Sequence, residues 1–161
     1  MRQQQVPADA YTYNSLLLAC KDARAVLRLL KEMKSEGLKP NVYCYTTAMK
    51  TCNRSNSSKH CLQLMADMKQ DGVRPSGSTF NIALVACRQK GRWQKALQLF
   101  AEMARQRITP DHLHYTSLML LLGKAGRREE LLSVVATLQA ALEHTITATT
   151  STGTSSSAAT G

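Results

Sequence analysis

The stretch from Pro75 to Asp111, PSGSTFNIALVACRQKGRWQKALQLFAEMARQRITPD, is one copy of a unit that recurs along the chain. The later copies are spaced by 35 residues, whereas Tyr13 lies only 32 residues before Tyr45. The first unit is therefore three residues short. A fixed period of this size predicts an array of structural repeats before any local propensity is considered. Three series keep the interval of 35 residues: Pro40, Pro75 and Pro110; Met33, Met68, Met103 and Leu138; Tyr45, Phe80 and Tyr115.

Each unit is predicted to form two short helices. In the second unit these cover residues 45–52 and 61–69, and the second helix carries its apolar residues at helical spacing. The segment Gly72-Val-Arg-Pro75 then ends the helix, because glycine tolerates a left-handed cap and proline cannot continue the hydrogen-bond ladder. The third unit ends Arg107-Ile-Thr-Pro110, without the glycine, so we expect a weaker cap there.

Helix pairs of this length bury an apolar stripe only by stacking on their neighbours, which predicts an all-α solenoid with a concave face. We place four helix-turn-helix repeats at residues 10–41, 42–76, 77–111 and 112–143. The deletion in the first repeat lies between Leu16 and Leu27, and we expect it to shorten the turn between the helices. Residues 1–9 form a lead-in, and the Ser/Thr-rich segment 144–161 is predicted to be a disordered tail.

The composition points to a polyanionic partner. The chain has 161 residues, with 21 Lys and Arg against 11 Asp and Glu, for a formal net charge of +10. Its longest apolar stretches, 16–20 and 118–122, are far shorter than the ~20 residues that span a bilayer, so no membrane partner is expected. The five cysteines form no CxxC pair, which favours a reducing compartment over a disulfide scaffold.

The sequence predicts no catalytic centre, metal or cofactor. It contains no phosphate-binding loop, GxSxG, HExxH or zinc-deaminase signature. His112 and His114 are two residues apart on a predicted helix, so they do not share a face well enough to hold a metal. Cys44, Cys52 and Cys87 are interpreted as packing residues. The chain is therefore not expected to be an enzyme.

Three segments carry a resemblance to a known family: Asn81–Cys87, Gly91–Met103 and Ile108–Asp111. With 13–21 and 31–40, they resemble the pentatricopeptide repeat family in its P-type form, over roughly residues 10–142. The resemblance implies a right-handed solenoid that binds single-stranded RNA, one base per repeat, in organellar RNA processing, stability or translation. It also implies a mitochondrial or chloroplast location and, as further partners, other RNA-processing proteins. The Trp and Leu-Gly pattern of the similarly sized tetratricopeptide repeat is not found.

In the resembled family, the polar residue after the aromatic of the first helix and the last residue of the repeat together read one base. The first set here is Asn14, Thr46, Asn81 and Thr116, and the second set is Asn41, Ser76 and Asp111. Small amides and hydroxyls suit this role because they match the donors and acceptors of unstacked bases. The structural alternative is that they only cap or begin helices. The family's combinations imply the preference 5′-C-purine-U-purine-3′, which is firmest at the uracil of Asn81 and Asp111.

The resemblance also implies residues that flank the bases, and a row of cations suggests phosphate contacts. The base-flanking positions are Tyr11, Tyr43, Ser78 and Leu113, where Ser78 departs from the aliphatic residue that the family prefers. Cations near the end of each first helix could neutralise phosphates or complement the helix dipole. These are Lys21, Arg54, Arg88, Lys90 and Lys124. The second-helix cations Lys31, Lys34, Lys69, Arg105 and Arg127 are expected to face solvent on the convex side.

Two other functions remain open from the sequence. The chain could be a protein-interaction solenoid whose basic groove binds an acidic peptide. It could also be the specificity arm of an RNA-processing enzyme whose catalytic domain lies outside this chain. The oligomeric state is left open.

Overall fold

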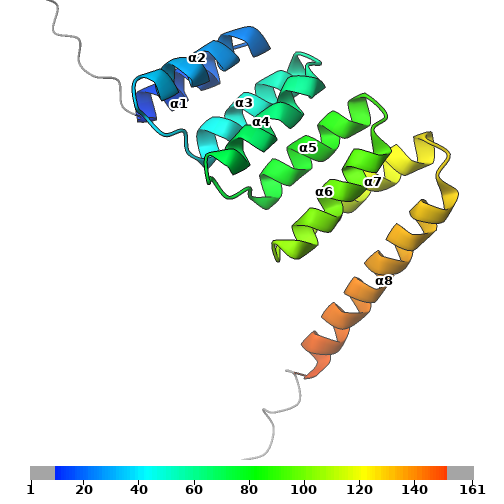
Figure 1. Ribbon diagram of the computed structural model, residues 1–161. Helices are drawn as coiled ribbons and strands as arrows, with labels where there is room; N and C mark the ends of the chain where they lie inside the picture. The colour runs from blue at the N-terminus through cyan, green and yellow to red at the C-terminus, as the bar shows by residue number, and fades with distance from the viewer. Residues whose placement is uncertain (1–9, 152–161) are drawn as a thin grey trace, which may run out of the picture.

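The computed structural model describes residues 10–151, and in this range it is entirely helical (Figure 1). The prediction of an all-α solenoid is confirmed. The first helices of the four repeats begin at residues 10, 42, 77 and 112. The eight helices are α1 (Ala10–Ala19), α2 (Ala23–Ser35), α3 (Val42–Arg54), α4 (Ser58–Gln70), α5 (Gly77–Gln89), α6 (Trp93–Arg105), α7 (His112–Lys124) and α8 (Arg128–Ser151).

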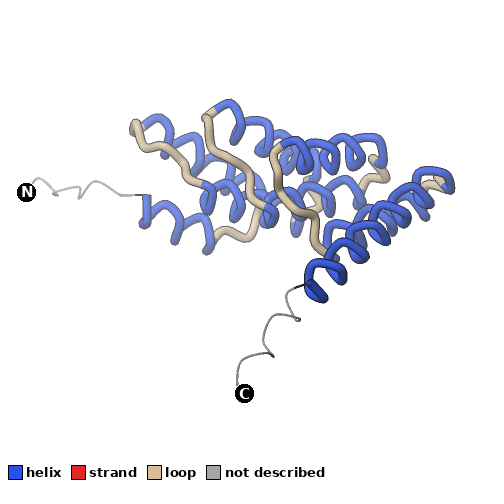
Figure 2. The backbone as a smooth tube through the Cα atoms, turned by 90° about the horizontal axis from the view of Figure 1, so that it is seen from below, coloured by secondary structure: helices blue, strands red, loops and turns tan. Residues whose placement is uncertain are grey.

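The helices form two layers. The first helix of each repeat, which we call helix A, packs directly on helix A of the next repeat, so α1, α3, α5 and α7 make one continuous layer. The second helices, or B helices, each pack on their own helix A and on helix A of the following repeat. Figures 1 and 2 show the resulting stack of helix pairs. Because the A helices are in direct mutual contact, they form the inner layer of the solenoid.

The apolar core runs between the layers without a break. Its repeating positions are fully or almost fully buried, including Met33, Met68 and Met103 at the ends of the B helices. Burying a side chain of this size contributes about 1.5–3 kcal/mol. Tyr45 is also buried, and its hydroxyl donates to the Asp71 carboxylate at the end of helix B in the same repeat. Burial, together with that carboxylate, raises the pKa of Tyr45 to about 12.

The deletion in the first repeat shortens helix A, and the expectation of a shorter turn is wrong. Helix α1 has 10 residues, whereas α3, α5 and α7 each have 13. The turn between α1 and α2 covers residues 20–22, the same length as the turn 55–57 in the second repeat. An antiparallel helix pair needs that minimum of chain to reverse, so the loss falls on the last turn of the helix.

The connections between repeats use a left-handed residue after each B helix. Gly37 and Gly72 have φ angles of 78° and 72°, and Arg107 takes the same position with a φ of 57°. The backbone N–H of Ile108 still donates to Met103 O at 2.9 Å, as Val73 does to Met68 in the second repeat. The geometry of the cap is therefore kept without the glycine, although a Cβ in this region costs about 1 kcal/mol or more.

The C-terminal helix extends beyond the predicted end of the solenoid. Helix α8 continues to Ser151, so residues 144–151 are helical and the predicted disordered tail is wrong for this part. No glycine or proline occurs between Gly126 and Gly153, so nothing in the sequence stops the helix earlier. The remaining predicted tail, 152–161, and the lead-in 1–9 lie outside the described residues.

Candidate nucleic-acid interface

The first set of predicted base-reading residues lies along the inner layer. Each residue follows an aromatic side chain that is buried in the core, so its own side chain comes out at the margin of the A helix. Asn14, Thr46 and Asn81 are half-buried, and Thr116 is exposed. The repeat spacing thus places one polar side chain at an equivalent position on the A helix of each repeat.

Two members of this set are hydroxyls whose protons are engaged. Thr46 Oγ1 donates to Val42 O at 2.6 Å, and Thr116 Oγ1 donates to His112 O at 2.7 Å. A hydroxyl in this state offers only its lone pairs to a ligand. These two positions are therefore acceptors and match the amino group of a base.

The two asparagines differ from the threonines because they keep amide donors. Ser117 of the next helix A donates to Asn81 Oδ1 across 3.5 Å, which occupies the oxygen rather than the amide nitrogen. Asn14 Oδ1 is buried with no hydrogen-bond partner in the described part of the chain. A buried polar atom without a partner is uncommon in a stable protein and marks a position where a ligand could complete the bonding.

The second set of predicted readers caps the following helices. Asn41 Oδ1 accepts from the backbone amides of Tyr43 and Cys44, both at 3.0 Å. Ser76 and Thr79 form a reciprocal capping box at the start of α5. Whether these residues also read a base stays a prediction, but they do cap helices through this geometry. The capping leaves the Asn41 amide nitrogen available but engages the Ser76 hydroxyl with Thr79.

Asp111 uses one carboxylate oxygen to cap helix α7, and its other oxygen takes no part in the cap. Its Oδ1 accepts from the amides of Leu113 and His114 and lies 2.6 Å from His114 Nδ1. Burial opposes ionisation, but the hydrogen bonds from His114 outweigh it and hold the pKa of Asp111 below its ordinary value. The side chain is 55% exposed, so Oδ2 remains a charged acceptor at the surface. His114 itself is buried, and its Nε2 lies 2.8 Å from Gly77 O.

The predicted base-flanking residues are all exposed. Tyr11 is 79% exposed, Tyr43 69% and Leu113 47%, and Ser78 is exposed too. Of the seven exposed large apolar side chains in the described part of the chain, six lie on A helices and only Leu132 lies on a B helix. The inner layer therefore exposes most of the large apolar side chains of the described residues, and exposed aromatic side chains serve as stacking platforms in single-strand binders in general.

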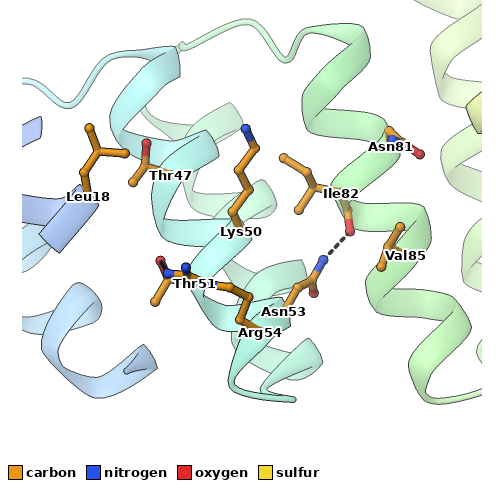
Figure 3. Close-up of a pocket in the computed structure, with 9 residues that line it drawn as sticks. All are labelled: Leu18, Thr47, Lys50, Thr51, Asn53, Arg54, Asn81, Ile82 and Val85. Atoms are coloured by element: carbon orange, nitrogen blue, oxygen red, sulfur yellow. Dashed lines mark hydrogen bonds between the residues drawn. The ribbon is translucent and has the colours of Figure 1, made fainter. Parts of the chain in front are cut away.

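A groove of about 410 Å³ lies between α3 and α5 on this layer. In Figure 3, Ile82 points into the groove beside Lys50, and Asn81 of α5 also lines the groove. Asn53 joins the two helices at the base of the groove, where its Nδ2 donates to Ile82 O at 2.8 Å. Its Oδ1 is buried without a partner in the residues described.

The sequence interpretation missed Lys50. This exposed lysine lines the groove and lies on the same face of α3 as Thr46 and Arg54, because the three residues are spaced by four. The same position is Val85 in the third repeat and Leu120 in the fourth, so no periodic signal singled it out. The spacing of four from a predicted reader could have found it.

The predicted phosphate-binding cations are at the C-terminal ends of the A helices or in the turns that follow. Lys21, Lys90 and Lys124 are exposed, and Arg88 is half-buried. Arg54 Nη2 donates to Thr51 Oγ1 at 3.2 Å and to Cys20 O of the preceding repeat at 3.4 Å. Arg54 thus also joins two repeats.

Of the five B-helix cations expected to face solvent, four are exposed and Lys69 is half-buried, but three of the five also form ion pairs. Lys34 pairs with Asp71 of the next repeat at 2.7 Å, and Lys69 pairs with Glu102 at 2.5 Å. Arg127 lies 4.1 Å from the centre of the Trp93 ring and pairs with Glu130. These charges hold neighbouring elements together because acids of the following helices reach them. Lys31 and Arg105 are exposed as expected.

Within residues 10–151 there is no group of three or more side chains that could hold a metal, and no helix there is long and apolar enough to cross a membrane. Cys44, Cys52, Cys61 and Cys87 are buried. Burial raises the pKa of Cys61 to about 12, so its thiol is not an activated nucleophile.

A family model described as the pentacotripeptide-repeat region of PRORP matches residues 1–154. The chain belongs to this family. The resemblance to pentatricopeptide repeats is thereby confirmed. Comparison with curated proteins by sequence found no match.

Solved structures of pentatricopeptide repeat proteins share the fold. The PPR domain of Arabidopsis thaliana protein-only RNase P 1, solved in complex with tRNA, has a TM-score of 0.74 and 20% identity, covering 88% of this chain and 76% of that domain. Maize PPR10 has a TM-score of 0.72 and 22% identity over 86% of this chain. A. thaliana PRORP2 has a TM-score of 0.67 and 16% identity over 80% of this chain. The chain spans only 20% of the PPR10 structure and 29% of the PRORP2 structure.

Proposed function

We propose that this chain binds single-stranded RNA along the A-helix layer, with one base for each repeat. The observation that carries the proposal is the recurrence, on one layer, of a polar reader in all four repeats, beside an exposed apolar or aromatic residue in three of them and beside Ser78 in the third. The membership of the family supports it, as do the structures of related repeats solved with tRNA and with an 18-nucleotide RNA element. Stacking and base-edge hydrogen bonds are the means by which single-stranded RNA is recognised.

The hydrogen bonds that the predicted base-reading side chains already form support the inferred base order 5′-C-purine-U-purine-3′. The Thr46 and Thr116 oxygens are acceptors, which suits the amino group of a purine such as adenine. In the third repeat, the Asn81 amide can donate to a uracil carbonyl, and the ionised Asp111 can accept from the uracil N3–H. Asn14 and Asn41 together form the proposed pyrimidine reader of the first repeat.

The match to the repeat region of PRORP favours one role for this RNA binding. We take the chain to be the specificity arm of an RNA-processing enzyme, with structured RNA such as tRNA among its substrates and with catalysis supplied outside residues 1–161. A mitochondrial or chloroplast location belongs to this proposal.

The test is a change of base preference at the third repeat. Asn81→Thr replaces the amide donor with a hydroxyl while Asp111 is kept, and we expect preference to shift from uracil to guanine by about 1 kcal/mol. Fluorescence anisotropy with short RNAs that differ only at the third contacted base measures it. An acidic peptide serves as the competing ligand. Unchanged ranking by a folded variant, or tighter binding of the peptide, would contradict the proposal.

A further inference from the structure

The two edges of the solenoid carry very different charge. We call the turns inside the repeats and the helix ends beside them, residues 16–26, 51–61, 86–96 and 121–131, the intra-repeat edge. We call the corresponding segments between repeats, residues 32–45, 67–80 and 102–115, the inter-repeat edge. Figure 1 shows the turns between α3 and α4, α5 and α6, and α7 and α8 on one side of the stack. The intra-repeat edge has eleven Lys and Arg against three acids, whereas the inter-repeat edge has six against six.

The charges of the intra-repeat edge are also largely unpaired. In the part of the chain that the structure describes, Arg127 is the one Lys or Arg of this edge that forms an ion pair with a carboxylate. In the third repeat, Lys90, Arg92 and Lys95 are exposed within six residues of one another. Eight of the ten excess positive charges of the chain therefore lie along a single edge, mostly open to solvent.

The cations at the starts of three B helices do not serve the stability of those helices. The N-terminal turn of a helix favours acids and disfavours cations, because the backbone dipole is positive there. Yet α2, α4 and α6 have no acid in the first turn, and they carry Arg24, Lys59 and Lys95 there instead. A repeated charge that the local structure disfavours needs another explanation, and attraction of a polyanion supplies one.

The cations form two rows, which indicates the kind of polyanion. One row is at the ends of the A helices and includes Arg54 and Lys124, while the other is at the starts of the B helices and includes Lys59 and Arg128. Axes of packed helices are about 8–10 Å apart, so the second row lies a full layer away from the face that holds the predicted base readers. A single strand has one line of phosphates, whereas a duplex has two.

We propose that the intra-repeat edge binds the backbone of double-helical RNA, such as a stem that flanks the single-stranded segment on the A-helix layer. Double-helical RNA is bound chiefly through its shape and its phosphates across the wide minor groove, and two rows of unpaired cations fit that requirement. The inference rests on the proposed function only in taking RNA as the ligand, because it uses a different surface and no base reader.

The experiment compares two variants with the same net charge. The edge variant combines Lys59→Gln, Arg92→Gln, Lys95→Gln and Arg128→Gln, all at exposed positions on the B-helix side of the intra-repeat edge. The control variant combines Arg28→Gln, Lys31→Gln, Lys39→Gln and Arg105→Gln, which are also exposed but lie outside that edge. The ligands are a blunt RNA hairpin of about 16 base pairs and a single strand of about 12 nucleotides.

We expect the edge variant to bind the hairpin roughly 30-fold more weakly and to lower its log–log salt slope by about 3.5, while the affinity for the single strand changes less than about twofold. The control variant should keep most of the hairpin affinity. Equal losses in both variants, equal losses for both ligands, or no loss for the hairpin would each overturn the proposal. If the hairpin binds and the single strand does not, the proposed function fails while this inference stands. Circular dichroism and thermal melting verify that both variants are folded.

Discussion

The inter-repeat edge and the intra-repeat edge are built from the same helices but use charge for opposite purposes. At the inter-repeat edge, Lys34 and Lys69 reach acids of the next repeat, and the Tyr45 hydroxyl joins the first of these pairs. At the intra-repeat edge, most cations are exposed and, among the described residues, only Arg127 pairs with a carboxylate, while the turns are closed by backbone hydrogen bonds such as that from Ser57 N to Cys52 O. The first edge holds the repeats in register, and the second is left free to bind.

This difference teaches that a net charge says little until the partner of each charge is known. Cations at both edges contribute to the same formal total. An exposed, unpaired cation loses little hydration when it meets a phosphate, whereas Lys34 would first have to leave Asp71. Breaking the ion pairs of the inter-repeat edge should therefore change mainly stability, and removing the unpaired cations of the intra-repeat edge should change mainly binding.

The largest effect is expected from Asp71→Ala at the inter-repeat edge. The change leaves the buried Tyr45 hydroxyl without its acceptor and Lys34 without its partner, so we expect the free energy of unfolding to fall by about 2 kcal/mol. Urea denaturation followed by circular dichroism measures it. Lys59→Ala at the intra-repeat edge is the comparison, and a similar loss there would break the distinction between the edges.

The contribution of Asp71 should also depend on pH. Hydrogen bonds from Lys34 and Tyr45 hold the pKa of this carboxyl below its ordinary value. The carboxylate therefore stabilises the fold above the unfolded-state pKa near ~3.9, and this contribution is lost as the pH falls through the lower folded-state pKa. Urea midpoints of the parent and of Asp71→Asn, measured from neutral to acidic pH, should converge at the acidic end. Parallel curves would show that the charge of Asp71 has no part in the pairing.

A smaller effect, of opposite sign, is expected from Arg107→Gly. Because Arg107 occupies the left-handed position that Gly72 fills in the preceding repeat, glycine should stabilise the protein by about 1 kcal/mol. The reciprocal variant Gly72→Ala should lose a similar amount through its φ angle alone, since no atom lies within 4 Å of the added Cβ. Two thermal unfolding curves that shift in the same direction would contradict this account of the cap.

The smallest effect is expected from Lys59→Glu at the intra-repeat edge. An acid in the first turn of α4 complements the helix dipole, so stability should rise by about 0.5 kcal/mol. Binding of the RNA hairpin should weaken in the same variant. Lys39→Glu, outside the helix N-termini, should leave stability unchanged. A loss of stability in Lys59→Glu would indicate that Lys59 supports the fold.

The period of 35 residues was sufficient to predict the fold, whereas the candidate base-reading and base-flanking residues came from the resemblance to pentatricopeptide repeats and stay predictions. A repeat fixes which positions recur in the core, so the register of Tyr45, Phe80 and Tyr115 places one following residue per repeat on the A-helix layer. The predicted base-flanking residues are exposed for the same reason. That each of these residues reads a base stays a prediction, because base reading depends on contacts with bound RNA.

What the period could not predict depends on contacts outside one repeat. The sequence predicts a shortened turn for the deletion between Leu16 and Leu27, because sequence spacing does not reveal that three residues are the minimum for this helix reversal. The pairing of Lys34 with Asp71 joins two repeats across a distance that no local pattern encodes. Lys50 occurs in a single repeat and breaks the periodicity from which the other sites were found.

The length of α8 has a mechanical consequence. At 1.5 Å per residue, its 24 residues extend about 36 Å, whereas the 13 residues of α4 or α6 extend about 20 Å. Figures 1 and 2 show α8 projecting past the end of the stack. A tilt of the last helix pair by about 10° would move Ser151 by roughly 6 Å, so α8 acts as a lever that converts a small rearrangement of the fourth repeat into a large displacement at its far end.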